Sequence, residues 1–156
     1  MLDLLDKGKR IINIDESWLN ESNFVHRAWC RKDGSSNFTI KPLGLRISVI
    51  AAIDTEGKVW YALTQVNTVS SVIEMFLHRL VKLLDQQEPG WSESTVIMMD
   101  NASYHASKAT KTAFEQLGLT VIYSAPYSYT SAPVETLFAL LKHGDINPRL
   151  LPSNMR

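Results

Sequence analysis

The chain has a single cysteine, Cys30, among its 156 residues, and 16 Lys and Arg side chains are balanced by 16 Asp and Glu. One thiol allows neither an internal disulfide nor a cysteine-rich zinc site. A formal charge of zero argues against a simple electrostatic nucleic-acid binder, which usually carries an excess of basic residues. No apolar run approaches the ~18 residues of a membrane helix, and the first residues lack a secretory signal pattern. We therefore expect a protein that is neither membrane-embedded nor secreted.

Three common catalytic signatures are also missing. The sequence contains no G-x-S-x-G elbow, no G-x-x-x-x-G-K-[ST] phosphate loop and no H-E-x-x-H zinc helix. These absences argue against a serine hydrolase, a P-loop nucleotidase and a zinc protease. Any chemistry must come from other side chains.

The charges that are present are unevenly distributed. Residues 27–46 contain five basic side chains and one acidic one, whereas the only charges in residues 83–101 are four acidic side chains. This asymmetry is compatible with a basic phosphate-binding edge beside an acidic pocket, although basic segments are more often ordinary solvated faces.

The hydrophobic pattern predicts one α/β domain with three strands, then alternating helices and strands. A buried strand over 10–15 ends on Asp15, and strands over 44–54 and 56–65 form a β-hairpin. Helices follow over 68–87, 106–118 and 133–144, with Gly118 ending the second and Pro133 opening the third. Between them lie strands over 94–99 and 119–124 and a Pro- and Ser-rich loop over 125–133. The alternation implies parallel pairing in the second half of a mixed sheet.

Three acidic residues stand out in this arrangement. Asp15 ends the first strand, Asp100 ends the fourth, and Glu135 lies in the first turn of the last helix. Sites in open α/β sheets form at the carboxyl ends of strands, so neighbouring first and fourth strands would bring Asp15 and Asp100 together. Each residue also has an ordinary explanation, as a strand-end cap, a turn residue and a helix N-terminal acid.

Clustered carboxylates repel one another unless cations are bound between them. Oxygen ligands suit Mg²⁺, with Mn²⁺ able to substitute. Two such ions about 4 Å apart can promote in-line attack on a phosphodiester without a nucleophilic side chain. The sequence is therefore compatible with two-metal phosphodiester chemistry.

Five segments in order carry a resemblance to a known family. They are "NIDESWL" with Asp15, "AWCRKDG" with Trp29, "RISVIAAIDTEG", "MMDNASYH" with Asp100, and "APYSYTSAPVETLFALLK" with Glu135. Together, over residues 10–142, they resemble the catalytic domain of mariner-superfamily DDE transposases and their bacterial insertion-sequence relatives, which have an RNase H-like fold. The 34 residues between Asp100 and Glu135 resemble the spacing in one branch of that superfamily.

The resemblance implies a role for each matched position. Asp15 would be shared by two Mg²⁺ ions, and Asp100 and Glu135 would each complete one metal site. Asn101 and His105 would lie near the DNA backbone or support the metal site, and Arg31 and Lys32 would contact phosphates. The loop departs from the family pattern at Ala125, Tyr129, Thr130, Ser131 and Ala132. These departures leave the three carboxylates intact.

The resemblance also implies partners. The family's N-terminal helix-turn-helix modules have no counterpart in these residues, so we expect a fragment, a separately encoded piece or a domesticated descendant. DNA is the expected partner, homodimerisation is compatible with the family, and the expected location is the nucleus in a eukaryote or the cytoplasm and nucleoid in a bacterium.

The sequence is compatible with three functions. The first is a DNA transposase that hydrolyses phosphodiesters at transposon ends and transfers the strand into target DNA. The second is a domesticated, non-catalytic module that binds DNA or protein. The third is a nuclease or resolvase of the same fold, which would share the metal chemistry and differ in its DNA substrate.

Overall fold

The computed structural model describes residues 2–19, 46–125 and 132–143. The strands are β1 (Arg10–Leu19), β2 (Ile47–Asp54), β3 (Val59–Thr64), β4 (Thr95–Met99) and β5 (Val121–Tyr123). The helices are α1 (Leu2–Asp6), α2 (Ser70–Gln87), α3 (Trp91–Ser94), α4 (Lys108–Gln116) and α5 (Pro133–His143). The order of strands and longer helices is the predicted one, and the short helices α1 and α3 were not predicted.

The strands form one mixed sheet in the order β3-β2-β1-β4-β5. β1, β2 and β3 pair antiparallel, whereas β4 and β5 run parallel to β1. This sheet, flanked by helices, confirms the expected RNase H-like α/β architecture. β1 is central, so the first strand indeed lies beside the fourth.

β1 is longer than its sequence pattern predicts, and Asp15 does not end it. The strand continues to Leu19 because residues 16–19 remain paired with β2, from Glu16 opposite Ile50 to Leu19 opposite Ile47. The apolar run stops at Asp15, but the backbone ladder does not require apolar side chains. The prediction of a strand end was therefore wrong, and Asp15 lies inside the strand.

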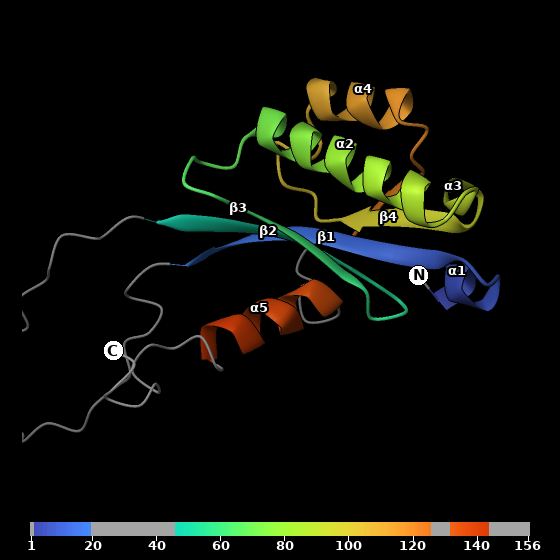
Figure 1. The fold of residues 1–156 in the computed structure, drawn as a ribbon, viewed down its shortest axis with the longest axis horizontal. Coiled ribbons are helices and arrows are strands. Elements are labelled where there is room, and N and C mark those ends of the chain that lie inside the picture. Colours follow the sequence, from blue (N-terminus) through green and yellow to red (C-terminus); the bar gives the residue numbers. More distant parts are fainter. Residues whose placement is uncertain (1, 20–45, 126–131, 144–156) are drawn as a thin grey trace, which may run out of the picture.

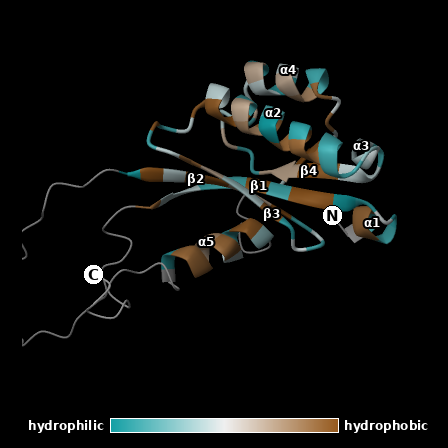
Figure 2. Ribbon diagram, viewed as in Figure 1, coloured by the Kyte–Doolittle hydropathy of each residue, from teal (hydrophilic) through white to brown (hydrophobic). Residues whose placement is uncertain are grey.

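Helices cover both faces of the sheet (Figure 1). α2 and α4 pack on one face over a core that includes Ile12, Ile14 and Leu77, all fully buried. α5 packs on the other face, where Val134 and Phe138 contact Val49 and Ala51 of β2. Figure 2 shows hydrophobic residues along parts of β1 and α5, as expected for elements that face a core.

The helix boundaries largely follow the predicted signals. α4 begins after Ser107, whose hydroxyl accepts a hydrogen bond from the Thr110 amide, and the chain leaves it through Gly118 with φ 65°. α5 begins at Pro133. α2 is an exception, because its N-cap is Val69 without a capping side chain, and the Ser70 hydroxyl pairs with Ser107 instead.

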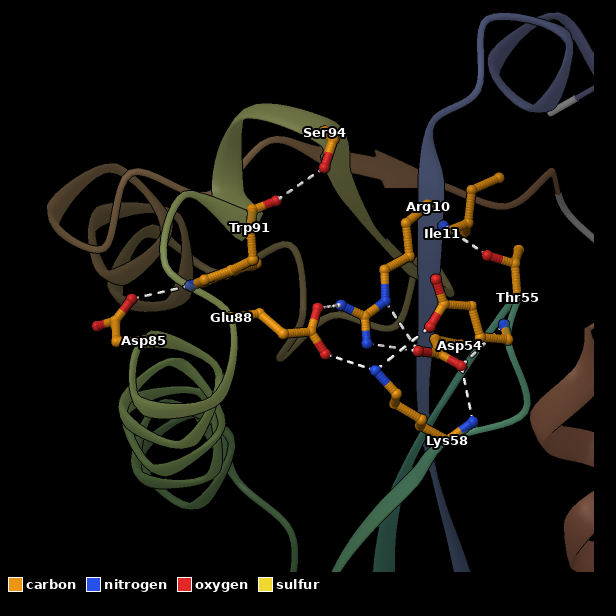
Figure 3. Close-up of polar contacts among 10 residues, drawn as sticks. Arg10, Ile11, Asp54, Thr55, Lys58, Asp85, Glu88, Trp91 and Ser94 are labelled. Atoms are coloured by element: carbon orange, nitrogen blue, oxygen red, sulfur yellow. Dashed lines mark hydrogen bonds and ion pairs between the residues drawn. The ribbon is translucent and has the colours of Figure 1, made fainter.

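A partly buried ion network ties the start of β1 to the β2–β3 turn and the end of α2 (Figure 3). The guanidinium of Arg10 donates from Nε to Asp54 at 2.8 Å and from Nη1 to Glu88 at 2.6 Å, and Lys58 also contacts Glu88. Arg10 also lies over the Trp60 ring. Both Arg10 and Asp54 are buried, so this pairing fixes one end of the sheet. Within the described ranges, no helix is long and apolar enough to cross a membrane.

Candidate carboxylate site

Asp15 and Asp100 stand at the same level on neighbouring strands. Asn13 of β1 is opposite Met98 of β4 in their parallel ladder, and each aspartate lies two residues further along its chain. Asp100 is the first residue after β4, as predicted. The parallel pairing of β1 and β4 therefore brings together two residues that are far apart in sequence.

Glu135 reaches the same region because α5 is tethered to β1. The Asn13 side chain accepts a hydrogen bond from the Val134 amide at 3.2 Å and donates one to the Met98 carbonyl at 3.3 Å. Asn13 is buried, and it thus joins the three elements that carry Asp15, Asp100 and Glu135. Glu135 follows Val134 directly and is exposed.

The three carboxylates influence one another electrostatically. The pKa of Asp15 is raised to about 7, chiefly by burial and also by the negative charges of Glu16, Asp100 and Glu135. A backbone hydrogen bond from Glu16 lowers it in part. An aspartate so perturbed is typical of a site that gains a cation. Among the residues that the structure describes, however, no three His, Cys, Asp or Glu side chains form a ready metal-binding group.

A buried histidine links Asp100 to a fourth carboxylate. His105 is fully buried, with Nδ1 2.5 Å from Asp100 Oδ1 and Nε2 2.8 Å from Glu16 Oε1. Burial lowers the pKa of His105, but the hydrogen bonds and charges of Glu16 and Asp100 raise it above its ordinary value overall. The imidazolium, which donates from both nitrogens, satisfies both carboxylates.

Glu16, Tyr104 and Asn13 are site residues that the sequence reasoning missed. The Tyr104 hydroxyl donates to Glu16 Oε2 at 3.0 Å. Glu16 follows Asp15 in β1, so the two side chains point to opposite faces of the sheet. Strand alternation was the available signal for Glu16, but the expected end of the strand at Asp15 obscured it.

The structure describes two of the four predicted DNA-contact residues. His105 is fully buried, and its ring nitrogens contact Asp100 and Glu16. Asn101 is exposed beside Asp100. Arg31 and Lys32, with Trp29 and most of the loop before Glu135, lie outside the described residues.

Comparisons with known proteins identify a family. The family model for DDE superfamily endonucleases matches residues 10–153, which confirms the resemblance seen in the sequence. No protein of curated function matches the chain in sequence.

Solved structures with the same fold include several of Mos1 transposase. A Mos1 paired-end complex with the left transposon end superposes with a TM-score of 0.67 at 23% identity, covering 91% of this chain and 45% of that one. The Mos1 mariner catalytic domain gives 0.65 at 22% identity, covering 91% and 65%. Its complex with raltegravir and Mg gives 0.63 at 22% identity, covering 85% and 59%. This chain thus spans less than half of the Mos1 chain in the paired-end complex.

Proposed function

This chain belongs to the DDE superfamily endonucleases, and we propose that it is the catalytic domain of a DNA transposase. Its reaction would be metal-dependent hydrolysis of phosphodiesters at transposon ends, followed by transfer of the exposed 3′-hydroxyl into target DNA. Mos1 structures with transposon ends, Mg and Mn support this proposal by likeness of fold.

One observation carries the proposal. Asp15 lies partly buried in the central strand, and burial is the main cause of its raised pKa; the charges of Asp100 and Glu135, which come from distant parts of the sequence, raise it further. A fold that needed only stability would gain by replacing Asp15 with a neutral residue. A cation held between the three carboxylates removes this penalty.

The three carboxylates would have different roles in metal binding. As the resemblance to the family implies, Asp15 would contact both ions, whereas Asp100 and Glu135 would each complete one site. When bound, Mg²⁺ or Mn²⁺ activates the attacking hydroxyl and stabilises the leaving oxygen of the phosphodiester. Asn101, exposed next to Asp100, and the basic residues Arg31 and Lys32 are the proposed contacts to the DNA backbone.

Nicking of supercoiled plasmid DNA in Mg²⁺ or Mn²⁺ tests the catalytic role. We expect the parent chain to convert the plasmid to open circles, and Asp15→Asn, Asp100→Asn and Glu135→Gln to lose at least 100-fold in rate. Glu115→Gln is the matched control, because Glu115 is an exposed acid on α4. Nicking by the three variants at the parental rate would disprove the mechanism.

A second candidate is a non-catalytic module that binds DNA or protein. The absence of a ready three-residue metal group among the described residues is the observation that favours it. Calorimetric titration with Mn²⁺, with and without duplex DNA, separates the two candidates. Binding that disappears in Asp15→Asn supports the enzyme, whereas no binding under either condition supports the module.

Further partners follow from the transposase proposal. We expect recognition of specific terminal repeats to require segments beyond this domain, and the active assembly to be a homodimer. The protein would act where its DNA is, in the nucleus of a eukaryotic host or the nucleoid of a bacterial one.

A further inference from the structure

We infer that Glu16 and His105 form a positioning pair that holds the Asp100 carboxylate in the orientation required for metal binding. The inference rests on the proposed function for the role of Asp100 as a metal ligand. The hydrogen bonds between these residues stand independently of that role.

Asp100 needs such support because of where it lies. It follows the last residue of β4, and half of its side chain is exposed. An exposed carboxylate beyond a strand end is free to rotate, and fixing it costs conformational entropy when metal binds. Here Oδ1 accepts hydrogen bonds from the Ala102 amide at 3.0 Å and from His105 Nδ1 at 2.5 Å, so one oxygen of the carboxylate is already held in place.

The imidazole ring is in turn held by a buried carboxylate. The side chain of Glu16 is only 2% exposed, and its two oxygens contact His105 Nε2 and the Tyr104 hydroxyl. A carboxylate buried without partners would cost several kcal/mol, so these two donors explain why Glu16 is tolerated there. Its position on the face of β1 opposite to Asp15 excludes Glu16 from the proposed ligand set.

The segment that carries His105 is itself fixed to the rest of the domain. The Tyr104 carbonyl accepts a hydrogen bond from the Thr110 hydroxyl at 2.7 Å, and the His105 carbonyl accepts one from the Tyr123 hydroxyl at 3.2 Å. The backbone that carries the ring is therefore tied to α4 and β5, while the ring itself is held by Asp100 and Glu16. Partners that orient a metal ligand typically change metal affinity 10- to 100-fold when they are removed.

Two replacements of His105 separate positioning from space filling. The amide nitrogen of Asn lies near the place of Nδ1 and can still donate to Asp100, whereas that of Gln lies near Nε2 and reaches towards Glu16. Mn²⁺ affinity of the full chain is measured by calorimetry, with thermal unfolding as a check on folding. We expect His105→Gln to bind Mn²⁺ about 10- to 100-fold more weakly and His105→Asn to lose clearly less. His78→Asn, at an exposed histidine of α2, is the matched control.

Equal losses in folded His105→Asn and His105→Gln would overturn the inference, because a space-filling role does not distinguish them. No loss in either variant would overturn it as well. Glu16→Gln provides a second variant with nearly the same shape, and we expect it to weaken Mn²⁺ binding by at least 3-fold. Parental affinity in folded Glu16→Gln would remove Glu16 from the pair.

NMR of the unaltered chain decides the matter if the His105 variants do not fold. We expect the His105 ring proton on Nδ1 to resonate far downfield without metal, to move in Asp100→Asn, and to shift on titration with Mg²⁺. If the resonance of this ring proton does not move in Asp100→Asn, the inference is overturned. If the parent binds no metal but the proton responds to Asp100→Asn, the proposed function fails and the hydrogen-bonded pair stands.

Discussion

The side chain of Asn13 accepts a hydrogen bond from the backbone amide of Val134, at 3.2 Å and across 121 residues of sequence. Through the same amide group Asn13 also contacts the Met98 carbonyl of β4. One buried side chain therefore sets the spacing between the strand that carries Asp15, the strand that leads to Asp100 and the helix that carries Glu135.

Asn13→Ala is expected to destabilise the domain by about 1–3 kcal/mol, because it leaves a buried amide without its partner. It should also weaken Mn²⁺ binding, since α5 loses its tether to β1. Urea unfolding and calorimetry measure the two effects. Asn67→Ala is the control, because Asn67 is exposed and its side chain accepts a hydrogen bond from Arg46 at the surface. A change within about 0.5 kcal/mol is expected there. Equal stability of the two variants would contradict the tether.

The pKa of Asp15 predicts how metal-free stability depends on pH. Its folded value of about 7 lies above the ordinary value of ~3.9, so the folded state binds more protons between these pH values. The contribution of Asp15 is therefore favourable below pH 4 and is lost as the pH rises towards 7 and above. Asp15→Asn should be more stable than the parent at pH 8 and should lose that advantage at pH 4.5. Urea unfolding with EDTA measures the difference, and an advantage independent of pH would contradict the shifted pKa.

Added Mn²⁺ supplies a further arm of the same experiment. Bound metal favours the ionised form of Asp15 and stabilises the folded state by mass action. We expect Mn²⁺ to raise the melting temperature of the parent at pH 7.5 and to leave that of Asp15→Asn almost unchanged. An equal rise in both proteins would indicate that the metal binds elsewhere.

The Arg10–Asp54 pair is expected to contribute most to the stability of the end of the sheet at which β1 begins and β2 ends. Arg10→Ala leaves the buried Asp54 carboxylate without its guanidinium and should cost about 3–5 kcal/mol. The double replacement Arg10→Met, Asp54→Asn should cost less than Arg10→Ala alone, since it leaves no unpaired charge. Lys7→Ala, which removes an exposed pair with Asp3, is the control and should cost at most about 1 kcal/mol. Urea unfolding of all three tests the order.

The outer face of β3 is expected to promote self-association. β3 is an edge strand, and its Tyr61 and Leu63 are 70% and 61% exposed. Exposed apolar edge strands pair readily with other chains, and a charge on the edge opposes this pairing. Leu63→Lys should therefore reduce association at high concentration in sedimentation velocity. Leu140→Lys, at an equally exposed leucine of α5, is the matched control, and an identical effect of both would assign the association to general hydrophobicity.

The sequence by itself determined the order of the main elements and the identity of the family. Alternating and helical hydrophobic patterns are local, so they placed the β2–β3 hairpin, the end of α4 near Gly118 and the start of α5 at Pro133. The order of its motifs identified the family, which the family model confirms. The roles of Asp15, Asp100 and Glu135 as metal ligands remain a prediction.

Tertiary structure alone decided how the site is supported. Continued pairing with β2 carries β1 past Asp15, and this places Glu16 on the face where Tyr104 and His105 lie. The hydrogen bond from the Val134 amide to Asn13 joins residues that are 121 positions apart in the sequence. No local pattern encodes such contacts, because they depend on which strands become neighbours and on which face each side chain meets its partner.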